Sequence, residues 1–303
     1  MQEQRKKWRG MAAAMALVVV SPMWAGGVPD DLGLQMASPV NELFTLSNDF
    51  SYSGMQGDLP GGDDQDHLSY LLTAAWPIAL EGGRTLTVRG YLPVKFSTPT
   101  YVTPDREYQE FLIRQQADEL PRDYNFFDGH GHLDDVAFDV AWGSVSETGV
   151  ISMFGLAAVL PTSQDGSVER DQYLLGPEVA LGRYTNHSVY GAWLSHLTNV
   201  HTVSGGKPKK YDTNETRIRV FFAHNLSRGW QLVSNPTIVY DWEGDGGNQW
   251  LVPLGGGVAR TTQWGSWPWR WSLEAQYYVE SPDAFGPQWL VNFNVTPVWP
   301  RGD

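Results

Sequence analysis

The stretch "VNFNVTPVW", residues 291–299, alternates apolar and polar side chains as far as Pro297. Val291 and Phe293 fall on one face of an extended strand, whereas Asn292 and Asn294 fall on the other. Because successive side chains of a strand point to opposite faces, this pattern predicts a strand with one apolar and one polar surface. A shift of one residue would exchange the two faces, so the register is strongly specified.

Similar segments recur along the whole chain, and each is long enough for a tilted strand to cross a bilayer. The predicted strands are residues 43–53, 67–78, 84–96, 135–146, 149–160, 173–183, 188–201, 214–226, 229–242, 248–262, 269–280 and 287–299. Segments 149–160 and 188–201 carry apolar residues on both faces, so either they are covered from inside or their boundaries are misplaced. Open sheet edges are not tolerated in hydrocarbon, so we predict an all-β fold, a transmembrane antiparallel up-and-down β-barrel of about 12 strands.

The first 25 residues have the composition of an export signal. Basic residues at 5–9 precede the apolar run "MAAAMALVVV" and a stretch of small residues that ends near Ala25. The run is shorter than the roughly 20 apolar residues of a transmembrane helix. We expect residues 1–25 to be a cleaved signal peptide and residues 26–303 to form a single barrel domain. Losing four basic residues and one acidic residue changes the formal net charge from −13 to −16, which argues against a nucleic-acid partner.

The connections between the predicted strands alternate in length. Those at 54–66, 97–134, 161–172, 202–213, 243–247 and 281–286 tend to be long, whereas those near 80–83, 147–148, 185–188, 227–228 and 263–268 are tight. Outer-membrane barrels have this arrangement, with long loops at one end and short turns at the other. The longest loop, 97–134, contains "DREYQEFLIRQQADEL" with helical spacing. It predicts a short helix that either enters the barrel mouth or lies on its rim.

Aromatic residues gather near the ends of the predicted strands. Examples are Trp76, Trp142, Trp230, Trp242, Trp250, Trp264, Trp267, Trp269, Trp289 and Trp299. Indole rings favour the headgroup layer of a membrane, where one side is wet and the other apolar. The pattern therefore favours two aromatic girdles over the alternative, a soluble β-sandwich with Trp in its core.

The polar faces of the strands carry charges of both signs. As candidates for the lining of the lumen we take Arg89, Lys95, Asp139, Glu178, Arg217, Arg219, Asp241, Arg270 and Glu274. A barrel of this size leaves limited interior space. These groups therefore either pair across strands and fill the interior or line a path for a solute, and the two interpretations are compatible.

Several stretches resemble a known family, in order along the chain. They are "GHLDDVAFDVAWG", "GLAAVLPTSQDG", "YLLGPEVALG", "VYGAWLSHLTNV" and the sequence from Gly229 onward. The chain resembles, over roughly residues 40–300, the family of the MetA pathway of phenol degradation, whose members are described as outer-membrane transporters. The resemblance implies a barrel in the outer membrane of a Gram-negative bacterium, with transport of small aromatic or hydrophobic molecules. It supplies no catalytic residues.

Other chemistry has weak support in the sequence. A lipid-modifying enzyme needs a Ser nucleophile near a His base, but "SHLTN" at 195–199 has Thr198 at the expected place. We expect no enzyme and no catalytic residue. The stretch "DGHGHLDD" at 128–135 contains two His and three Asp, and the chain has no Cys. We expect neither a bound metal nor a cofactor.

The favoured function is therefore passage of small molecules through the barrel. The alternatives are a structural or surface-interaction barrel that transports nothing and, further behind, a lipid-modifying outer-membrane enzyme. The expected partners are outer-membrane lipids, a small-molecule solute and the barrel-insertion machinery during biogenesis. For that machinery, Trp299 supplies an aromatic residue close to the end of the chain.

Overall fold

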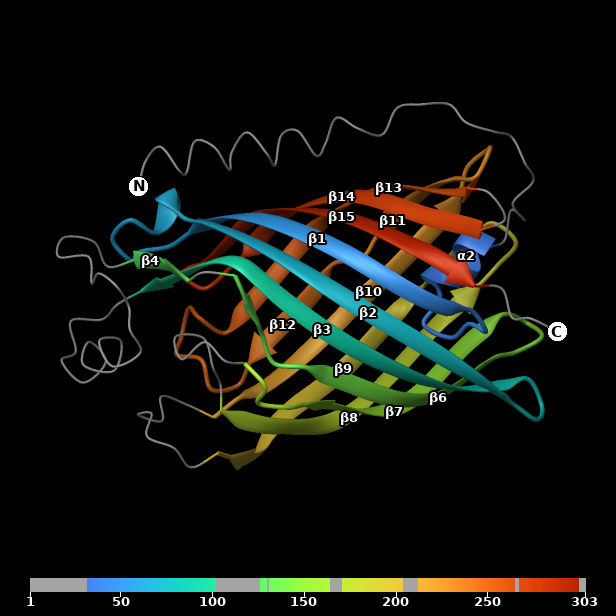
Figure 1. Cartoon of the computed structure of the whole chain (residues 1–303), viewed down its shortest axis with the longest axis horizontal. Coiled ribbons are helices and arrows are strands. Elements are labelled where there is room, and N and C mark those ends of the chain that lie inside the picture. Colours follow the sequence, from blue (N-terminus) through green and yellow to red (C-terminus); the bar gives the residue numbers. More distant parts are fainter. Residues whose placement is uncertain are drawn as a thin grey trace.

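The computed structural model describes residues 32–101, 126–129, 131–163, 171–203, 212–264 and 267–299. Within these ranges the strands form one antiparallel sheet that closes on itself (Figure 1). The wall strands are β1 (Phe44–Gln56), β2 (Asp66–Leu80), β3 (Arg84–Tyr101), β6 (Ala137–Val145), β7 (Val150–Val159), β8 (Gln172–Tyr184), β9 (Ser188–Thr202), β10 (Asn214–Asn225), β11 (Trp230–Ser234), β12 (Thr237–Asp241), β13 (Trp250–Trp264), β14 (Trp267–Glu280) and β15 (Gly286–Trp299). Among the described residues, no helix is both long and apolar enough to cross a membrane.

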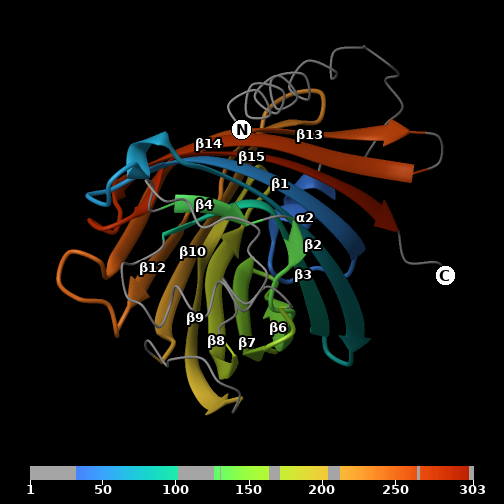
Figure 2. The same cartoon turned by 60° about the vertical axis from the view of Figure 1, so that its left-hand side comes forward.

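The wall has twelve positions in the described part of the chain, because β11 and β12 both lie between β10 and β13. Each predicted strand coincides with one of these positions to within a few residues, which confirms the predicted barrel. The barrel closes where β1 pairs with β15, from Phe44 opposite Trp299 to Gln56 opposite Gly286. Figure 2 shows β6 to β9 on the opposite side of the barrel from β14, β15 and β1.

Connections of two kinds lie at the two ends of the barrel. The tight turns form what we call the short-turn end, and the connections after β1, β3, β7, β9, β12 and β14 belong to the other, long-loop end (Figure 1). Two short strands, β4 (Phe126–Gly129) and β5 (His132–Leu133), pair with the long-loop part of β3. The predicted loop 97–134 therefore begins as a continuation of β3 up to Tyr101, and the helix predicted within it lies outside the described residues.

The outer face of the wall is apolar. Large side chains that point away from the lumen are exposed on most strands, including Val88, Leu92, Phe138, Phe154, Leu156, Leu181, Leu194, Leu254, Leu273 and Val291. A monomeric soluble protein rarely exposes so continuous an apolar surface. The belt matches the lipid-facing band of a membrane barrel, and it includes Val291, which the alternation assigned to the apolar face.

Aromatic side chains border the apolar belt at both ends. Toward the short-turn end, Trp76 packs edge-on against Phe44, and Trp230 packs in the same way against Trp271. Toward the long-loop end, Tyr240 packs against both Trp242 and Trp250, and Tyr52 packs against Trp289. These clusters agree with the two girdles predicted from the sequence.

One predicted strand, 229–242, is broken in two at Asn235 and Pro236. Proline has no backbone N–H to donate to a neighbouring strand. The backbone and side-chain amides of Asn235 instead donate to the Glu274 carboxylate on β14, at 3.0 and 2.8 Å. Between them runs β13, where a side chain at Gly257 would collide with the backbone carbonyl of Leu273. Glycine is therefore required where β13 approaches β14 most closely.

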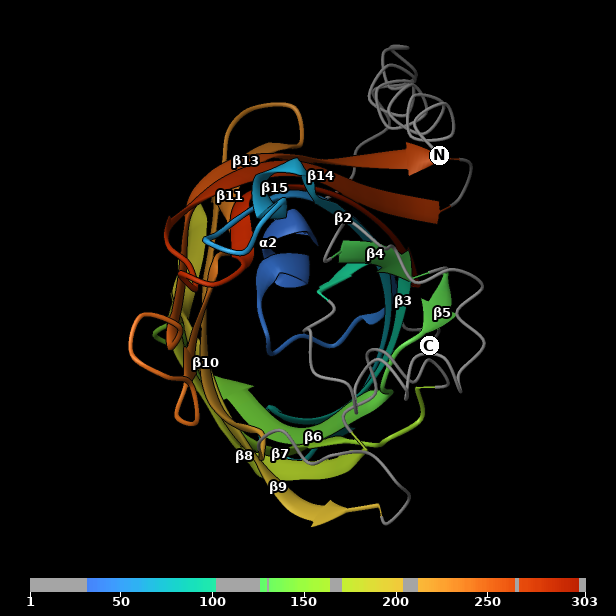
Figure 3. The ribbon, with the colours of Figure 1, turned by 90° about the vertical axis from the view of Figure 1, so that its left-hand side faces the viewer.

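A short helix, α2 (Leu32–Ala37), lies inside the barrel at the short-turn end (Figure 3). We call residues 32–43, which comprise α2 and the turn leading to β1, the N-terminal plug. The helix ends before Pro39, and the Ser38 hydroxyl both donates to the Val40 carbonyl and accepts from the Val40 N–H. Asn41 closes the turn by donating to the Ser38 carbonyl at 3.0 Å. The plug thus pairs several of its own backbone hydrogen-bonding groups locally. No pattern in the sequence predicted this helix inside the barrel.

The plug and the inner wall form an apolar core. Leu34 and Val40 of the plug pack with Ala141, Ile151, Met153, Ala180, Val189, Phe221, Ala223, Val233 and Ala259 of the wall, all of them buried. This explains why segments 149–160 and 188–201 carry apolar residues on both faces. One face meets lipid and the other is covered from inside by the plug, so the first of the two sequence-based interpretations is correct.

Candidate functional site

The inner face of the barrel changes character along its length. On β10 the inward residues run from Ala223 and Phe221, both buried, to Arg219, Arg217 and Glu215 nearer the long-loop end. Arg219 is exposed, and the Arg217 side chain is 41 % exposed. The inward face of β10 is therefore apolar and covered toward the short-turn end, and charged and accessible beyond it.

A buried ionic group marks the boundary between these two parts. The Arg89 guanidinium pairs with Asp139 at 2.8 Å and with Glu178 at 3.3 Å. The three residues are only 6 %, 1 % and 2 % exposed, respectively. Buried charges are tolerated when they are paired and hydrogen-bonded, and here one guanidinium serves two carboxylates from β6 and β8.

Two aromatic residues complete this group, which we call the Arg89 cluster. Trp193 of β9 donates from its indole nitrogen to Glu178 at 3.2 Å, and the Arg89 guanidinium lies 4.3 Å from the centre of its ring. The Tyr91 hydroxyl donates to Asp139. Stacking of a guanidinium on an indole is favourable, the more so away from water. Trp193 and Tyr91 were absent from the sequence-based candidates because their types alone did not mark them as partners of charge.

The Arg89 cluster holds the N-terminal plug directly. Nη1 of Arg89, the terminal nitrogen that is not used by the two ion pairs, donates to the backbone carbonyl of Pro39 at 3.2 Å. A side chain at Gly143 would lie 2.5 Å from a methyl group of Val40, so glycine lets the plug approach the β6 wall. The plug is thus fixed by one charge-assisted hydrogen bond and by apolar packing.

A second polar contact lies beneath α2. Gln231 of β11 is almost fully buried, accepts from the Arg270 guanidinium at 3.1 Å and donates to Asn225 at 2.7 Å. A side chain at Gly33 would lie within 3 Å of the Gln231 amide, which shows how closely the helix approaches it. Gln231 was not among the sequence-based candidates, because a single amide in a strand gives no signal of its own.

The remaining candidates are spread around the lumen. Lys95 pairs with Asp134 at 2.7 Å, and Arg217 pairs with Glu215. Asp241 accepts from the Glu243 backbone N–H at 3.0 Å and lies opposite Glu215 in the register. Of the nine candidates, the structure brings only Arg89, Asp139 and Glu178 into one cluster.

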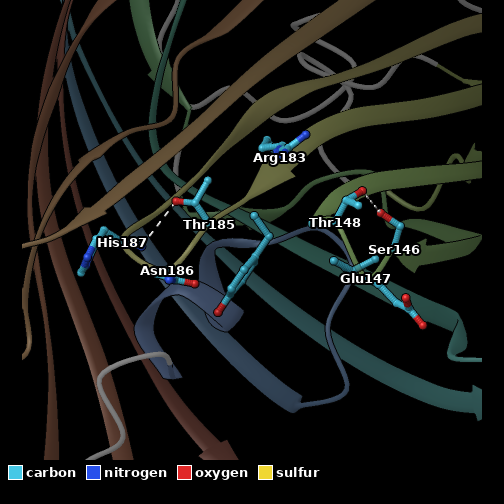
Figure 4. Close-up of a pocket in the computed structure, with 10 residues that line it drawn as sticks. Ser146, Glu147, Thr148, Arg183, Thr185, Asn186 and His187 are labelled. Carbon is cyan, nitrogen blue, oxygen red and sulfur yellow. Dashed lines mark hydrogen bonds between the residues drawn. The ribbon is translucent and has the colours of Figure 1, made fainter.

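An open pocket lies at the short-turn end, between two neighbouring tight turns (Figure 4). The turns 145–149 and 183–187 line it. Its polar groups are largely occupied by turn hydrogen bonds, such as those of Thr185 with Ser188 and of Ser146 with Thr148. We assign no binding role to this pocket.

The sequence contains two further candidate sites, the His-Asp stretch at 128–135 for a metal ion and His196 for hydrolysis. Among the described residues, no three His, Asp or Glu side chains are close enough to hold a metal ion. The side chains of Asp128 and His130 in the His-Asp stretch lie outside the described residues. The predicted signal peptide, residues 1–25, also lies outside them. His196 hydrogen-bonds to Thr216 at 2.9 Å.

Comparison with solved structures identifies the class of fold. The chain is similar to an outer membrane channel from Pseudomonas putida F1, with a TM-score of 0.58 and 11% identity, over 92% of this chain and all of that one. The NanC porin gives a TM-score of 0.48 at 8% identity, covering 85% of this chain and all of the porin. No family model and no curated protein matches the sequence.

The chain therefore has the fold of an outer-membrane β-barrel of Gram-negative bacteria, as predicted. In such barrels the short turns face the periplasm and the long loops face the outside. By this rule the N-terminal plug lies at the periplasmic end, and the charged inward residues of β10 lie toward the exterior.

Proposed function

We propose that the protein is an outer-membrane channel for small molecules of aromatic or hydrophobic character, and that it belongs to the phenol-degradation family that its sequence resembles. One observation carries the proposal. A separate segment, the N-terminal plug, lies inside the lumen at the short-turn end and packs against the inner wall.

A barrel with no transport role can fill its interior with its own side chains. Here the inner wall carries Ile151, Met153 and Phe221, which would line an apolar opening if the plug moved aside. The plug contributes only a few buried residues, chiefly Leu34 and Val40, and it precedes β1 without being part of the wall. An apolar passage of this kind suits a solute with an aromatic or aliphatic body.

The test compares the wild type with a Leu34→Asp variant, which places a carboxylate in the apolar core and should expel the plug. Purified protein in planar bilayers and in liposomes gives ion conductance and the uptake of phenyl glucoside, an aromatic solute that crosses lipid slowly. We expect both to rise severalfold in the variant.

The control is Gln35→Asp, which adds the same carboxylate to the same helix at a half-buried position. It should change conductance much less. A barrel that admits neither ions nor phenyl glucoside in either variant would exclude the channel and favour the structural alternative.

A further inference from the structure

The basic residues of the described chain fall into two groups. Arg84, Arg183, Arg228 and Arg260 lie at the short-turn end, outside the lumen, where Arg84 and Arg260 lie over the rings of Trp142 and Trp230. Arg89, Lys95, Arg217, Arg219 and Arg270 point into the barrel. The cations available to a solute are therefore those of the second group.

Four of these five inward cations are occupied. Arg89, Lys95 and Arg217 have carboxylate partners, and Arg270 donates to Gln231. Arg219 makes neither an ion pair nor a hydrogen bond with any described residue, and it is exposed in the lumen. A guanidinium is always charged and carries five donors, so an exposed one without a carboxylate partner is a ready site for an anion.

Arg219 lies beside the ring of Trp193. Its guanidinium lies 5.7 Å from the centre of the Trp193 ring, and the two residues are directly opposite each other on β10 and β9. Trp193 is itself held by Glu178 and by the stacked guanidinium of Arg89. Arg219 thus sits beside the Arg89 cluster, immediately on the outer side of the plug.

Acidic groups near Arg219 leave its donors unoccupied. Asp49 of β1 interacts with it electrostatically, but the Asp49 carboxylate accepts from the Ser47 hydroxyl at 3.1 Å. Glu178 is occupied by Arg89 and Trp193, and Glu215 by Arg217 two residues along the same strand. No carboxylate among the described residues forms an ion pair with the Arg219 guanidinium.

We propose that Arg219 is the recognition site for a carboxylate on the transported solute, so that small organic acids, aromatic acids in particular, are bound in preference to neutral analogues. The carboxylate would pair with the Arg219 fork, and the body of the solute would lie over the plug. The assignment rests on the proposed channel function for its biological meaning, but the binding site itself can be tested without transport.

The test is equilibrium dialysis of radiolabelled benzoate, with benzamide as its neutral analogue, against the full-length protein in detergent. Benzoate should bind more tightly than benzamide. Arg219→Gln should weaken benzoate binding roughly tenfold, the effect of one charge-assisted hydrogen bond, and leave benzamide unchanged. Arg183→Gln, which removes the same charge outside the lumen, should alter neither.

A second measurement separates this proposal from the channel itself. In planar bilayers under a salt gradient, Arg219→Gln should shift the reversal potential toward cation selectivity, whereas Arg183→Gln should not. Unchanged benzoate binding in Arg219→Gln would overturn the proposal even if the barrel conducts. Benzoate binding that depends on Arg219 in a barrel that conducts nothing would support the site and contradict the channel function.

Discussion

The two halves of the lumen are built on the same strands but differ in how far the inner wall is covered. At the periplasmic end, inward residues such as Ile151 and Phe221 are buried against the plug, as in the core of a soluble protein. At the outer end, inward residues such as Arg217 and Arg219 remain accessible. Alternation along a strand tells outside from inside, but it does not tell a filled interior from a wet one.

The largest effect is expected at the boundary between the halves. Asp139→Ala leaves the Arg89 guanidinium buried with one partner fewer, which costs about 3–5 kcal/mol for a buried pair. This loss is measured as a change in the free energy of unfolding, obtained by denaturant titration in detergent micelles. The matched variant Glu215→Ala removes the partner of the accessible Arg217 and should cost about 0–1 kcal/mol. Equal losses would mean that the Arg89 cluster is solvated like the outer lumen.

An intermediate effect is expected within the plug. Leu34→Ala deletes a fully buried side chain and should weaken docking of the plug by about 2–5 kcal/mol. Because the chain has no Cys, Ala37→Cys introduces a single thiol whose maleimide labelling reports release of the plug. Labelling should accelerate in the Leu34→Ala background. It should not change with Leu181→Ala, which shortens an exposed, lipid-facing side chain. Equal labelling in all three backgrounds would show that Leu34 does not hold the plug.

The smallest effect concerns the fit between plug and wall. Gly143→Ala places a methyl group against Val40 and should cost about 1–3 kcal/mol through overpacking. The same thiol at position 37 should label somewhat faster in this variant. Gly90→Ala is the control, because a Cβ there meets nothing within 4 Å. If both substitutions leave labelling unchanged, the plug can shift enough to accept a methyl group.

The barrel could be predicted because its signal is local. Each strand shows its own two-residue period, so strand positions and faces were readable before any pairing was known. The break within 229–242 also has a local cause, since Pro236 stands in the middle of it. The alternation nevertheless continues on both sides of the break, so the pattern predicts a single strand over residues 229–242.

The plug could not be predicted in the same way. Its helix, "LGLQMA", has six residues, too few to show a helical period. An indirect sign existed, because segments 149–160 and 188–201 are apolar on both faces and therefore need an inner cover. The contacts of Arg89 with Glu178 and Pro39 were out of reach of sequence reasoning, because they join groups far apart in the chain and depend on side-chain geometry inside the barrel.

Arg89 also has a mechanical consequence. From β3 its side chain reaches Asp139 on β6, Met153 on β7, Glu178 on β8 and the ring of Trp193 on β9. One side chain thereby connects five neighbouring strands of the barrel. Any change in the diameter of the barrel should therefore come from the other strands. The distance between spin labels on β3 and β9 should stay constant, while the distance between spin labels on β10 and β1 should vary.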